Sequence, residues 1–587
     1  MGKQIPFNRE SEMPSIAVSQ GDMAWNKTGS WRTQRPFYED KTPPCNAACP
    51  AGNDIVSFIL KIVQGDFEGA WNLIREENPF PGICGRVCFH PCEQKCNRGS
   101  FDDPLAIRAL ERFVAEFASH LPSQKINLLE KERKSRKRKE KIAIIGAGPA
   151  GMSCAYHLAR LHYNVTVFEA LPSAGGVLRT GIPSYRLPRE VLDRELSTIE
   201  TLGAKVKTGM PIGQEMEMED LKDYSAIFVA AGAHRSRQLR VPGEKGRNVS
   251  SGLDFLKAIN LGKEVEVGRR IAIIGGGNTA IDVARSLVRL GKNPIILYRR
   301  SREEMPAFEE EVIEALEEGV EFRFLVSPIR ILEQKGIKRL ECLRMKLAEK
   351  DETGRRRPVA VSDSQFLIEA EQVIVAAGEE VDVSFLSRGI RKREGIVLTH
   401  TGGGTSVNGI FAGGDFASRE RTVAHAIGSG KRSAIAIDSY LKKEDPEKVI
   451  QSLLVGYGPS VSIFPYFHPG ERIRSSHVVT FEELNLDYFE KAKRVEEAKY
   501  LLPERTKGFF EVASPLTERT ALEEAERCFN CGTCNECDTC YTFCPDASIL
   551  KGIQSLSHQV DYDFCKGCGI CYVECPRRAI SLKEEER

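Results

Sequence analysis

The chain has 587 residues, 18 of them cysteine, and its 83 basic and 82 acidic side chains leave a net charge of +1. This length allows roughly three to four domains. The balanced charge means that the chain as a whole has no positive excess that would attract nucleic acid or an anionic membrane. No apolar run approaches the ~20 residues that span a bilayer, and residues 1–14 lack the apolar core of a signal peptide. We therefore expect no secretion, and cysteines held as metal thiolates in the reducing cytoplasm.

An extended arm is predicted for residues 1–40 and a helical, cysteine-rich domain for residues 41–130. Six cysteines in the helical domain do not divide into two sites of four thiolates each. A basic run over residues 131–141 follows, which we interpret as a solvated linker; the alternative is a docking site for an acidic partner such as a ferredoxin. The six cysteines are Cys45, Cys49, Cys84, Cys88, Cys92 and Cys96.

A first dinucleotide-binding motif begins at Lys141, where an apolar strand leads through a glycine turn into a helix. Gly146, Gly148 and Gly151 form G-x-G-x-x-G, in which the glycines allow the turn, the approach of a pyrophosphate and close helix–strand packing. The next strand ends at Glu169, whose carboxylate suits the ribose hydroxyls of an adenosine. The pattern predicts a dinucleotide site, and an acid at this position favours FAD.

A second copy of the motif contains Gly275, Gly277 and Ala280. Its second strand leads not into an acid but into Tyr298-Arg299-Arg300-Ser301-Arg302. Planar guanidinium groups pair well with a 2′-phosphate, so Arg299 and Arg300 favour NADPH over NADH. The alternative is that these arginines are only surface charge, and Arg302 fits that description best.

Later segments extend both sites. The stretches at 373–378 and 410–415 are similar to the strands that close the FAD domain of two-dinucleotide flavoproteins, and a helix after Arg421 should point its N-terminus at the isoalloxazine. We expect His425 to be a helix residue rather than a base, and no general base is needed, because hydride transfer requires juxtaposed rings. Arg179, Pro183 and Tyr185 either face a substrate or pack the loop. The further predicted cofactor contacts are Ala150, Gly175, Gly176, Leu178, Arg186, Ala231, Gly232, Asn278, Thr279, Ala377, Gly378, Gly414, Asp415, Thr422 and Ala424.

The C-terminal segment, residues 526–587, contains ten cysteines, eight of which form two copies of C-x2-C-x2-C-x3-C-P. This run is typical of a ferredoxin with two [4Fe–4S] clusters, in which the fourth cysteine of each run ligates the other cluster. Zinc sites need neither the third cysteine nor the Cys-Pro, which disfavours zinc. Cys528 and Cys531 are left without a partner. The predicted ligand sets are Cys534, Cys537, Cys540 and Cys575 for one cluster, and Cys544, Cys565, Cys568 and Cys571 for the other.

Residues 41–440 resemble the small subunit of bacterial glutamate synthase, the N-terminal half of dihydropyrimidine dehydrogenase and the NADPH-binding subunit of electron-bifurcating transhydrogenase. The resemblance rests on T-P-P-C-N-A-A-C-P at 42–50, G-R-V-C-x-x-P-C-E-x-x-C at 85–96, Y-R-R-S-R-E-E-M-P at 298–306 and both glycine motifs. It implies two [4Fe–4S] clusters in the helical domain.

Members of that family usually carry an E-A-x-R-C-x-x-C segment ahead of the first motif, whereas this chain has it at 524–531. The resemblance therefore implies that Cys528 and Cys531 reach back to complete a cluster with Cys45 and Cys96. It implies Cys49, Cys88, Cys92 and Glu111 for the second. Two alternatives stay open: Cys84 replaces Glu111, or Cys528 and Cys531 merely extend the ferredoxin module. The lone Cys154 and Cys342 are expected to be buried apolar residues.

The expected fold class is α/β, with two Rossmann-like domains preceded by a helical iron–sulfur domain and followed by a ferredoxin-like domain. The expected function is an oxidoreductase that passes electrons from NADPH through FAD and four [4Fe–4S] clusters to a ferredoxin or a partner subunit, in a hetero-oligomer and in either direction. Alternatives are an electron-wiring subunit without catalysis, or a diaphorase that reduces dyes or ferric chelates alone. A thioredoxin-reductase-like activity is disfavoured, because it needs a C-x2-C beside the flavin. The predicted boundaries are 141–260 and 376–440 for the FAD domain, 261–375 for the NAD(P)H domain, 441–525 for a tether and 526–587 for the ferredoxin.

Overall fold

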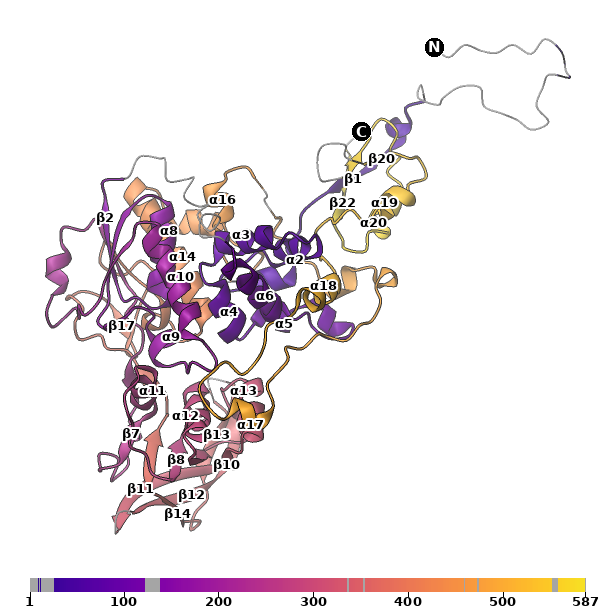
Figure 1. Ribbon diagram of the computed structural model, residues 1–587. Helices are drawn as coiled ribbons and strands as arrows, with labels where there is room; N and C mark the ends of the chain where they lie inside the picture. Colours follow the sequence, from indigo (N-terminus) through magenta and orange to yellow (C-terminus); the bar gives the residue numbers. More distant parts are fainter. Residues whose placement is uncertain are drawn as a thin grey trace.

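The computed structural model describes residues 26–121, 138–334, 337–351, 354–458, 460–471, 474–551 and 558–585, together with positions 9 and 11. Most of the predicted arm and of the basic run therefore lies outside the described residues. The chain folds into a helical domain, an FAD domain, an NADPH domain and a ferredoxin module, with the helical domain in the middle (Figure 1). No helix in the described ranges has the length and apolar character needed to cross a bilayer.

The FAD domain is a parallel sheet of five strands in the order β19-β5-β2-β3-β4, with helices packed on it. Its central strands are nearly uniform apolar runs, because both faces are covered. Helices α8 and α14 pack against each other on one side (Figure 1). The elements are β2 (Lys141–Ile145), α8 (Pro149–Arg160), β3 (Asn164–Phe168), α9 (Val177–Thr180), α10 (Arg189–Thr201), β4 (Lys205–Lys207), β5 (Ala226–Val229), β19 (Ile410–Ala412) and α14 (Val423–Lys442).

The NADPH domain has a second parallel sheet, in the order β10-β9-β8-β15-β7. Residues 249–260 belong here rather than to the FAD domain where the predicted boundary placed them, because β7 pairs with β15. The strand at 373–375 lies between β8 and β7, inside the predicted range 261–375 of this domain, although its similarity to FAD-closing strands pointed to the other sheet. The elements are β7 (Val249–Ser251), α11 (Gly252–Asn260), β8 (Arg270–Ile274), α12 (Asn278–Arg289), β9 (Asn293–Tyr298), α13 (Glu309–Glu317), β10 (Glu321–Phe324) and β15 (Gln372–Val375).

An antiparallel sheet inserted between β10 and β15 departs from the alternation of strand and helix that the sequence indicated. Its long hairpins project at the end of the NADPH domain (Figure 1). A short antiparallel pair, β6 (Arg235–Ser236) with β16 (Glu379–Glu380), marks the place where the chain passes between the two nucleotide domains. The strands of the insertion are β11 (Val326–Gln334), β12 (Ile337–Lys350), β13 (Arg356–Ala360) and β14 (Phe366–Ala370).

The helical iron–sulfur domain is built from short helices with strong start signals. Asp54 accepts a hydrogen bond from the backbone of Ser57, and Asp66 from that of Gly69, so each caps the helix it precedes. The helices pack around a core that is continuous with that of the FAD domain. They are α1 (Pro44–Ala48), α2 (Ile55–Val63), α3 (Phe67–Glu77), α4 (Pro81–Val87), α5 (Pro91–Gln94) and α6 (Ile107–Ser119).

The ferredoxin module incorporates part of the predicted N-terminal arm. Strand β1 pairs antiparallel with β22, so two segments more than 500 residues apart in the sequence form one sheet. Residues between α14 and the module include α15 (Pro446–Ser452), α16 (Phe464–Phe467), α17 (Leu502–Arg505) and α18 (Glu518–Glu526). The module itself consists of β1 (Gln34–Tyr38), α19 (Thr539–Thr542), β20 (Ile549–Leu550), β21 (Gln559–Val560), α20 (Ile570–Val573) and β22 (Ile580–Glu584).

Candidate cofactor sites and electron path

One cavity of about 1140 Å³ lies between the FAD and NADPH domains, and both glycine turns open into it. Gly151, Gly175, Ala280 and Ala424 are not among its lining residues; they pack the elements behind it. The predicted cofactor residues that line the cavity are Gly146, Gly148, Ala150, Glu169, Gly176, Leu178, Arg186, Ala231, Gly232, Gly275, Gly277, Asn278, Thr279, Arg299, Arg300, Ala377, Gly378, Gly414, Asp415 and Thr422.

The FAD half of the cavity fits a dinucleotide pyrophosphate. A Cβ on Gly148 would meet nothing nearer than the Gly176 Cα at 4.0 Å. The absence of a side chain at Gly148 therefore leaves open the space next to the turn in which a pyrophosphate would bind. Glu169 stands at the end of β3, and its carboxylate accepts hydrogen bonds from the backbone N–H groups of Ala147 at 2.7 Å and Leu171 at 2.8 Å. Burial raises the pKa of Glu169. The acid is thus anchored on the glycine turn, where a ribose would lie.

Helix α14 begins at the opposite wall of this half. Thr422 caps it by accepting a hydrogen bond from the backbone of His425, and Thr422 and Val423 line the cavity. A helix N-terminus favours an electron-rich group. Asp415 lies close by, and burial raises the pKa of its carboxyl to about 6. His425 pairs with Glu420 at 2.9 Å, which agrees with its prediction as a helix residue.

The NADPH half is bounded by β8, the glycine turn and the start of α12. A Cβ on Gly277 would approach only Pro306 at 3.9 Å, which leaves space for a pyrophosphate. Asn278 accepts a hydrogen bond from the backbone of Phe308, and Thr279 donates to Glu379 at 2.9 Å. The turn is therefore tied both to α13 and to the crossing between domains.

The arginines after β9 have different surroundings. Arg300 is buried, and its guanidinium donates to the Arg356 carbonyl at 2.8 Å and to Asp351 at 2.5 Å, so it holds the inserted sheet. Arg299 lines the cavity together with Arg237 and Arg355. Burial lowers the pKa of Arg299, and neighbouring positive charges, first that of Arg300, add to the effect. A 2′-phosphate would neutralise this cluster. Sequence reasoning missed Arg237 and Arg355, which follow no motif.

Replacing Arg299 by Ala should raise the KM for NADPH about 100-fold, since a charge-assisted phosphate pairing contributes about 1.5–3 kcal/mol. The KM for NADH should change little. Steady-state dye reduction with both nucleotides measures the effect. Arg302, which pairs with Glu309 at the surface, supplies the control variant Arg302→Ala. An equal change with NADH would contradict a role in phosphate recognition.

Two features link the cavity to the helical iron–sulfur domain. Val87 lines the cavity and directly precedes Cys88, and the next residue, Phe89, stacks with Phe308 of the NADPH domain at 5.8 Å and with His425 at 6.0 Å. Helix α14 also approaches the loop after Cys49 so closely that a Cβ on Gly428 would lie 1.9 Å from the Pro50 carbonyl oxygen. Three domains thus meet beside the cavity, at the predicted ligands Cys49 and Cys88.

The thiols of Cys45, Cys96, Cys528 and Cys531 lie together, although they come from opposite ends of the chain. Burial raises the pKa of Cys45 well above its usual range, and the other three thiols add to the effect, first Cys96. Asn97 donates a hydrogen bond to the Cys531 sulfur. The structure places these four residues as the reach-back prediction requires.

The segment around Cys528 is docked by several independent contacts. Glu524 accepts from the backbone of Ala106 at 2.7 Å, and Arg98 donates to the Arg527 carbonyl at 2.9 Å. The backbone of Lys41 donates to the Gly532 carbonyl at 2.9 Å. Residues 524–532 therefore form part of the helical domain.

Cys49, Cys88 and Cys92 form a second group, which contains both candidates for the fourth position. Glu111 and Cys84 each lie near Cys88. The Glu111 carboxylate accepts from Asn53 at 3.2 Å and Asn78 at 3.0 Å, and burial raises its pKa to about 8. The choice between them stays a prediction. Cys154 and Cys342 are buried.

Each predicted ferredoxin ligand set borders its own small cavity. Cys534, Cys537, Cys540 and Cys575 line one, and Cys544, Cys565, Cys568 and Cys571 line the other. In the described part of the chain, no three His, Cys, Asp or Glu side chains are close enough to share a single metal ion. Soft thiolates arranged around a cavity suit a cluster of several atoms. Cys537 and Cys568 are exposed, so both sites reach the surface.

The loop residues left open by the sequence pack rather than face the cavity. The Tyr185 ring is fully buried beneath the Arg289 guanidinium at 3.7 Å. Arg179 donates to the Ala174 carbonyl at 2.5 Å and pairs with Asp193. Arg186 lines the cavity, but its guanidinium is held by Asp282 at 2.9 Å and Glu311 at 2.8 Å.

Comparison with known families agrees with this arrangement. Residues 140–430 match the family "Pyridine nucleotide-disulphide oxidoreductase", residues 33–122 match "dihydropyrimidine dehydrogenase domain II, 4Fe-4S cluster", and residues 558–581 match "4Fe-4S binding domain". The chain is 32% identical to the glutamate synthase [NADPH] small chain of Halomonas elongata, over 68% of this chain and 88% of that protein. It belongs to the glutamate synthase small-chain family of flavo-iron–sulfur oxidoreductases. The predictions of fold class, FAD, NADPH and [4Fe–4S] clusters are confirmed.

Two other relatives share more of the chain. The beta subunit of NADP(+)-dependent formate dehydrogenase from Moorella thermoacetica is 39% identical over 85% of this chain and 71% of its own length. The beta subunit of NADPH-Fe(3+) oxidoreductase from Geobacter sulfurreducens (strain ATCC 51573 / DSM 12127 / PCA) is 35% identical over 84% of this chain and 76% of its own length. This family member therefore transfers electrons between NADPH, FAD and iron–sulfur clusters. Its relatives are named as subunits of larger complexes.

Proposed function

We propose that this chain is the NADP(H)-linked electron-transfer subunit of a hetero-oligomer, and that its catalytic partner docks at the ferredoxin module. The observation that carries the proposal is the order of the sites. The cavity adjoins Cys88 through Val87, the two helical-domain cysteine groups follow, and the exposed Cys537 and Cys568 stand at the far end. A relative of this kind is the beta subunit of an NADP(+)-dependent formate dehydrogenase.

An FAD held in the cavity would supply a site that takes a hydride from NADPH as an electron pair and gives the electrons up one at a time. Glu169 and the turn at Gly148 would hold its adenosine end, and the N-terminus of α14 would face its ring system. Arg299 would hold the nicotinamide nucleotide. In the helical domain, Cys45, Cys96, Cys528 and Cys531 would ligate one cluster, and Cys49, Cys88, Cys92 and Glu111 the next.

One anaerobic experiment distinguishes this function from the two alternatives, an electron-wiring subunit without catalysis and a reductase that acts alone. NADPH mixed with the purified chain should bleach the flavin within seconds, whereas a subunit with a vestigial nucleotide site should show no bleaching. Reduction of ferric chelates by the chain alone should be slow. Adding the copurified catalytic partner should give fast electron transfer to its substrate. Equal rates with and without the partner would favour a stand-alone ferric reductase.

A further inference from the structure

Residues 497–513 form an extended strap that runs out from the helical iron–sulfur domain to the NADPH domain and back (Figure 1). The strap includes α17, which lies beside α13. Its contacts with the three surrounding domains are ion pairs, hydrogen bonds and one aromatic contact, between Phe509 and Tyr185. The family motifs say nothing about this segment.

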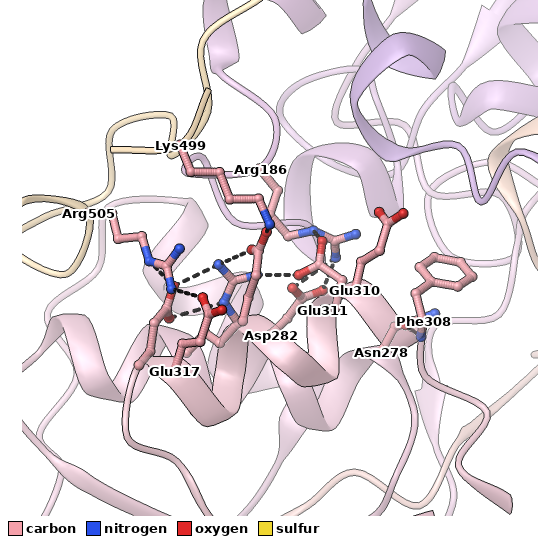
Figure 2. A network of polar contacts seen from close by, with 12 residues as sticks. Arg186, Asn278, Asp282, Phe308, Glu310, Glu311, Glu317, Lys499 and Arg505 are labelled. Atoms are coloured by element: carbon pink, nitrogen blue, oxygen red, sulfur yellow. Dashed lines mark hydrogen bonds and ion pairs between the residues drawn. The ribbon is translucent and has the colours of Figure 1, made fainter. Parts of the chain in front are cut away.

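On the NADPH domain, the strap binds the acidic face of α13. Lys499 donates to Glu314 at 2.6 Å, and Arg505 pairs with Glu317 at 2.5 Å and lies 3.6 Å from Glu318 (Figure 2). Arg505 is only 5% exposed. Glu318 is fully buried and also pairs with Arg285 and Arg289 of α12. The strap cations thus complete the charge balance of a network between α12 and α13.

The same network reaches the FAD domain. Arg186 pairs with Asp282 of α12 at 2.9 Å and with Glu311 of α13 at 2.8 Å (Figure 2). The residues directly before Arg186 contact the strap, since Ser184 donates to the Phe509 carbonyl at 2.9 Å and the Val512 backbone donates to that of Tyr185 at 3.2 Å. The FAD-domain loop, α12, α13 and the strap therefore form one connected structure.

Both ends of the strap are fixed on the helical iron–sulfur domain. Arg112 pairs with Glu497 at 2.7 Å and donates to the Ala513 carbonyl at 2.8 Å. Arg86 pairs with Glu511 at 2.7 Å, and its side chain is almost completely buried. The strap is consequently a closed loop anchored at its base, with its tip on the NADPH domain.

Besides the strap and the two ion pairs of Arg186, the NADPH domain is joined to the FAD domain by the crossing at β6 and β16 and by Asn260 of α11, which donates to the Thr180 carbonyl at 2.9 Å. Domains joined by a short crossing usually rotate relative to each other, whereas hydride transfer requires reacting atoms about 3–3.5 Å apart. We propose that the strap is a clamp that holds the NADPH domain in the arrangement for hydride transfer, and that Lys499 and Arg505 are positioning residues acting through α13. This inference rests on the NADPH-oxidising function of the family.

The test uses the full-length holoprotein with both cations replaced, Lys499→Met and Arg505→Met. Stopped-flow mixing with NADPH should show flavin reduction slowed on the order of 10-fold, because the productive arrangement is populated less often. The dissociation constant for NADPH should stay within about two-fold, since the glycine turn and Arg299 are untouched. Hydrogen exchange, measured without NADPH, should become faster in α13 and at β6 and β16.

The matched control removes two surface cations elsewhere, Arg339→Met and Arg519→Met, whose pairs with Glu369 and Glu523 are exposed. It should behave as the unaltered protein, and the charge-conserving pair Lys499→Arg and Arg505→Lys should restore most of the rate. The single variant Lys499→Met, at a half-exposed position, should show a smaller slowing in the same direction.

An unchanged rate of flavin reduction in the double variant would overturn the clamp, with or without faster exchange. Faster exchange alone would mean that the strap stabilises α13 without positioning the domain. The rate measurement and the hydrogen-exchange measurement also distinguish a failure of the clamp from a failure of the function on which it rests. If the unaltered protein showed no flavin reduction by NADPH, the function would fail, whereas unchanged exchange in the double variant would refute the clamp alone.

Discussion

Replacing both Cys528 and Cys531 by Ala should remove one [4Fe–4S] cluster of the helical domain and leave the ferredoxin clusters in place. Iron in the anaerobically purified protein should fall from about 16 to about 12 per chain, since each [4Fe–4S] cluster holds four irons and this one would lose two of its four thiolate ligands. The reason is spatial: these two thiols lie with Cys45 and Cys96, away from the cavities bordered by the other eight C-terminal cysteines.

Iron analysis and low-temperature EPR of the reduced protein measure this effect. The control is Cys342→Ala, which removes a buried lone thiol and should leave the iron content unchanged. If the variant instead lost the spectrum of a ferredoxin cluster, Cys528 and Cys531 would belong to the ferredoxin module. An unaltered protein with about 8 irons would refute the two helical-domain clusters.

Replacing Lys431 by Met should destabilise the contact between the FAD and helical domains by about 3–5 kcal/mol, which lowers the apparent melting temperature by about 10 °C. Lys431 lies in α14, is fully buried, and donates to Glu77 at 2.5 Å and to the Ala51 carbonyl at 2.6 Å. Its loss leaves the buried Glu77 carboxylate without a cation. Calorimetry under anaerobic conditions measures the shift.

Lys61→Met is the matched control, because Lys61 pairs with Asp66 at the surface, where such pairs contribute about 0–1 kcal/mol. The double variant Lys431→Met with Glu77→Gln should regain part of the loss, since it leaves no unpaired charge. An unchanged melting temperature in the single variant would show that Glu77 is stabilised sufficiently by Ser462, Ile463 and Phe464, which also donate to it.

Local sequence was sufficient wherever chemistry depends on spacing along the chain. The turn at Gly148, the acid at Glu169 and the two ferredoxin runs follow from short motifs, because a glycine turn or a loop around a cluster is built from consecutive residues. Most of the predicted cofactor residues accordingly line one cavity.

Assignments that depend on strand pairing were less secure. The strand at 373–375 has the apolar run expected of either nucleotide domain, and only its pairing with β7 and β8 places it in the NADPH sheet. Likewise, Arg299 and Arg300 are adjacent and chemically identical and both line the cavity, yet the inserted sheet engages only the Arg300 guanidinium, through Asp351. Neither distinction is encoded in a local motif.

The sequence by itself therefore determined the cofactors, the two nucleotide folds and the family, because these depend on short motifs whose chemistry is local. The displaced family segment also predicted that Cys528 lies beside Cys45. Only the tertiary structure decided the other long-range contacts: it joined β1 to β22 and laid the strap across three domains. These contacts join residues hundreds of positions apart, and they exist only because burial and charge pairing become favourable once the domains have assembled.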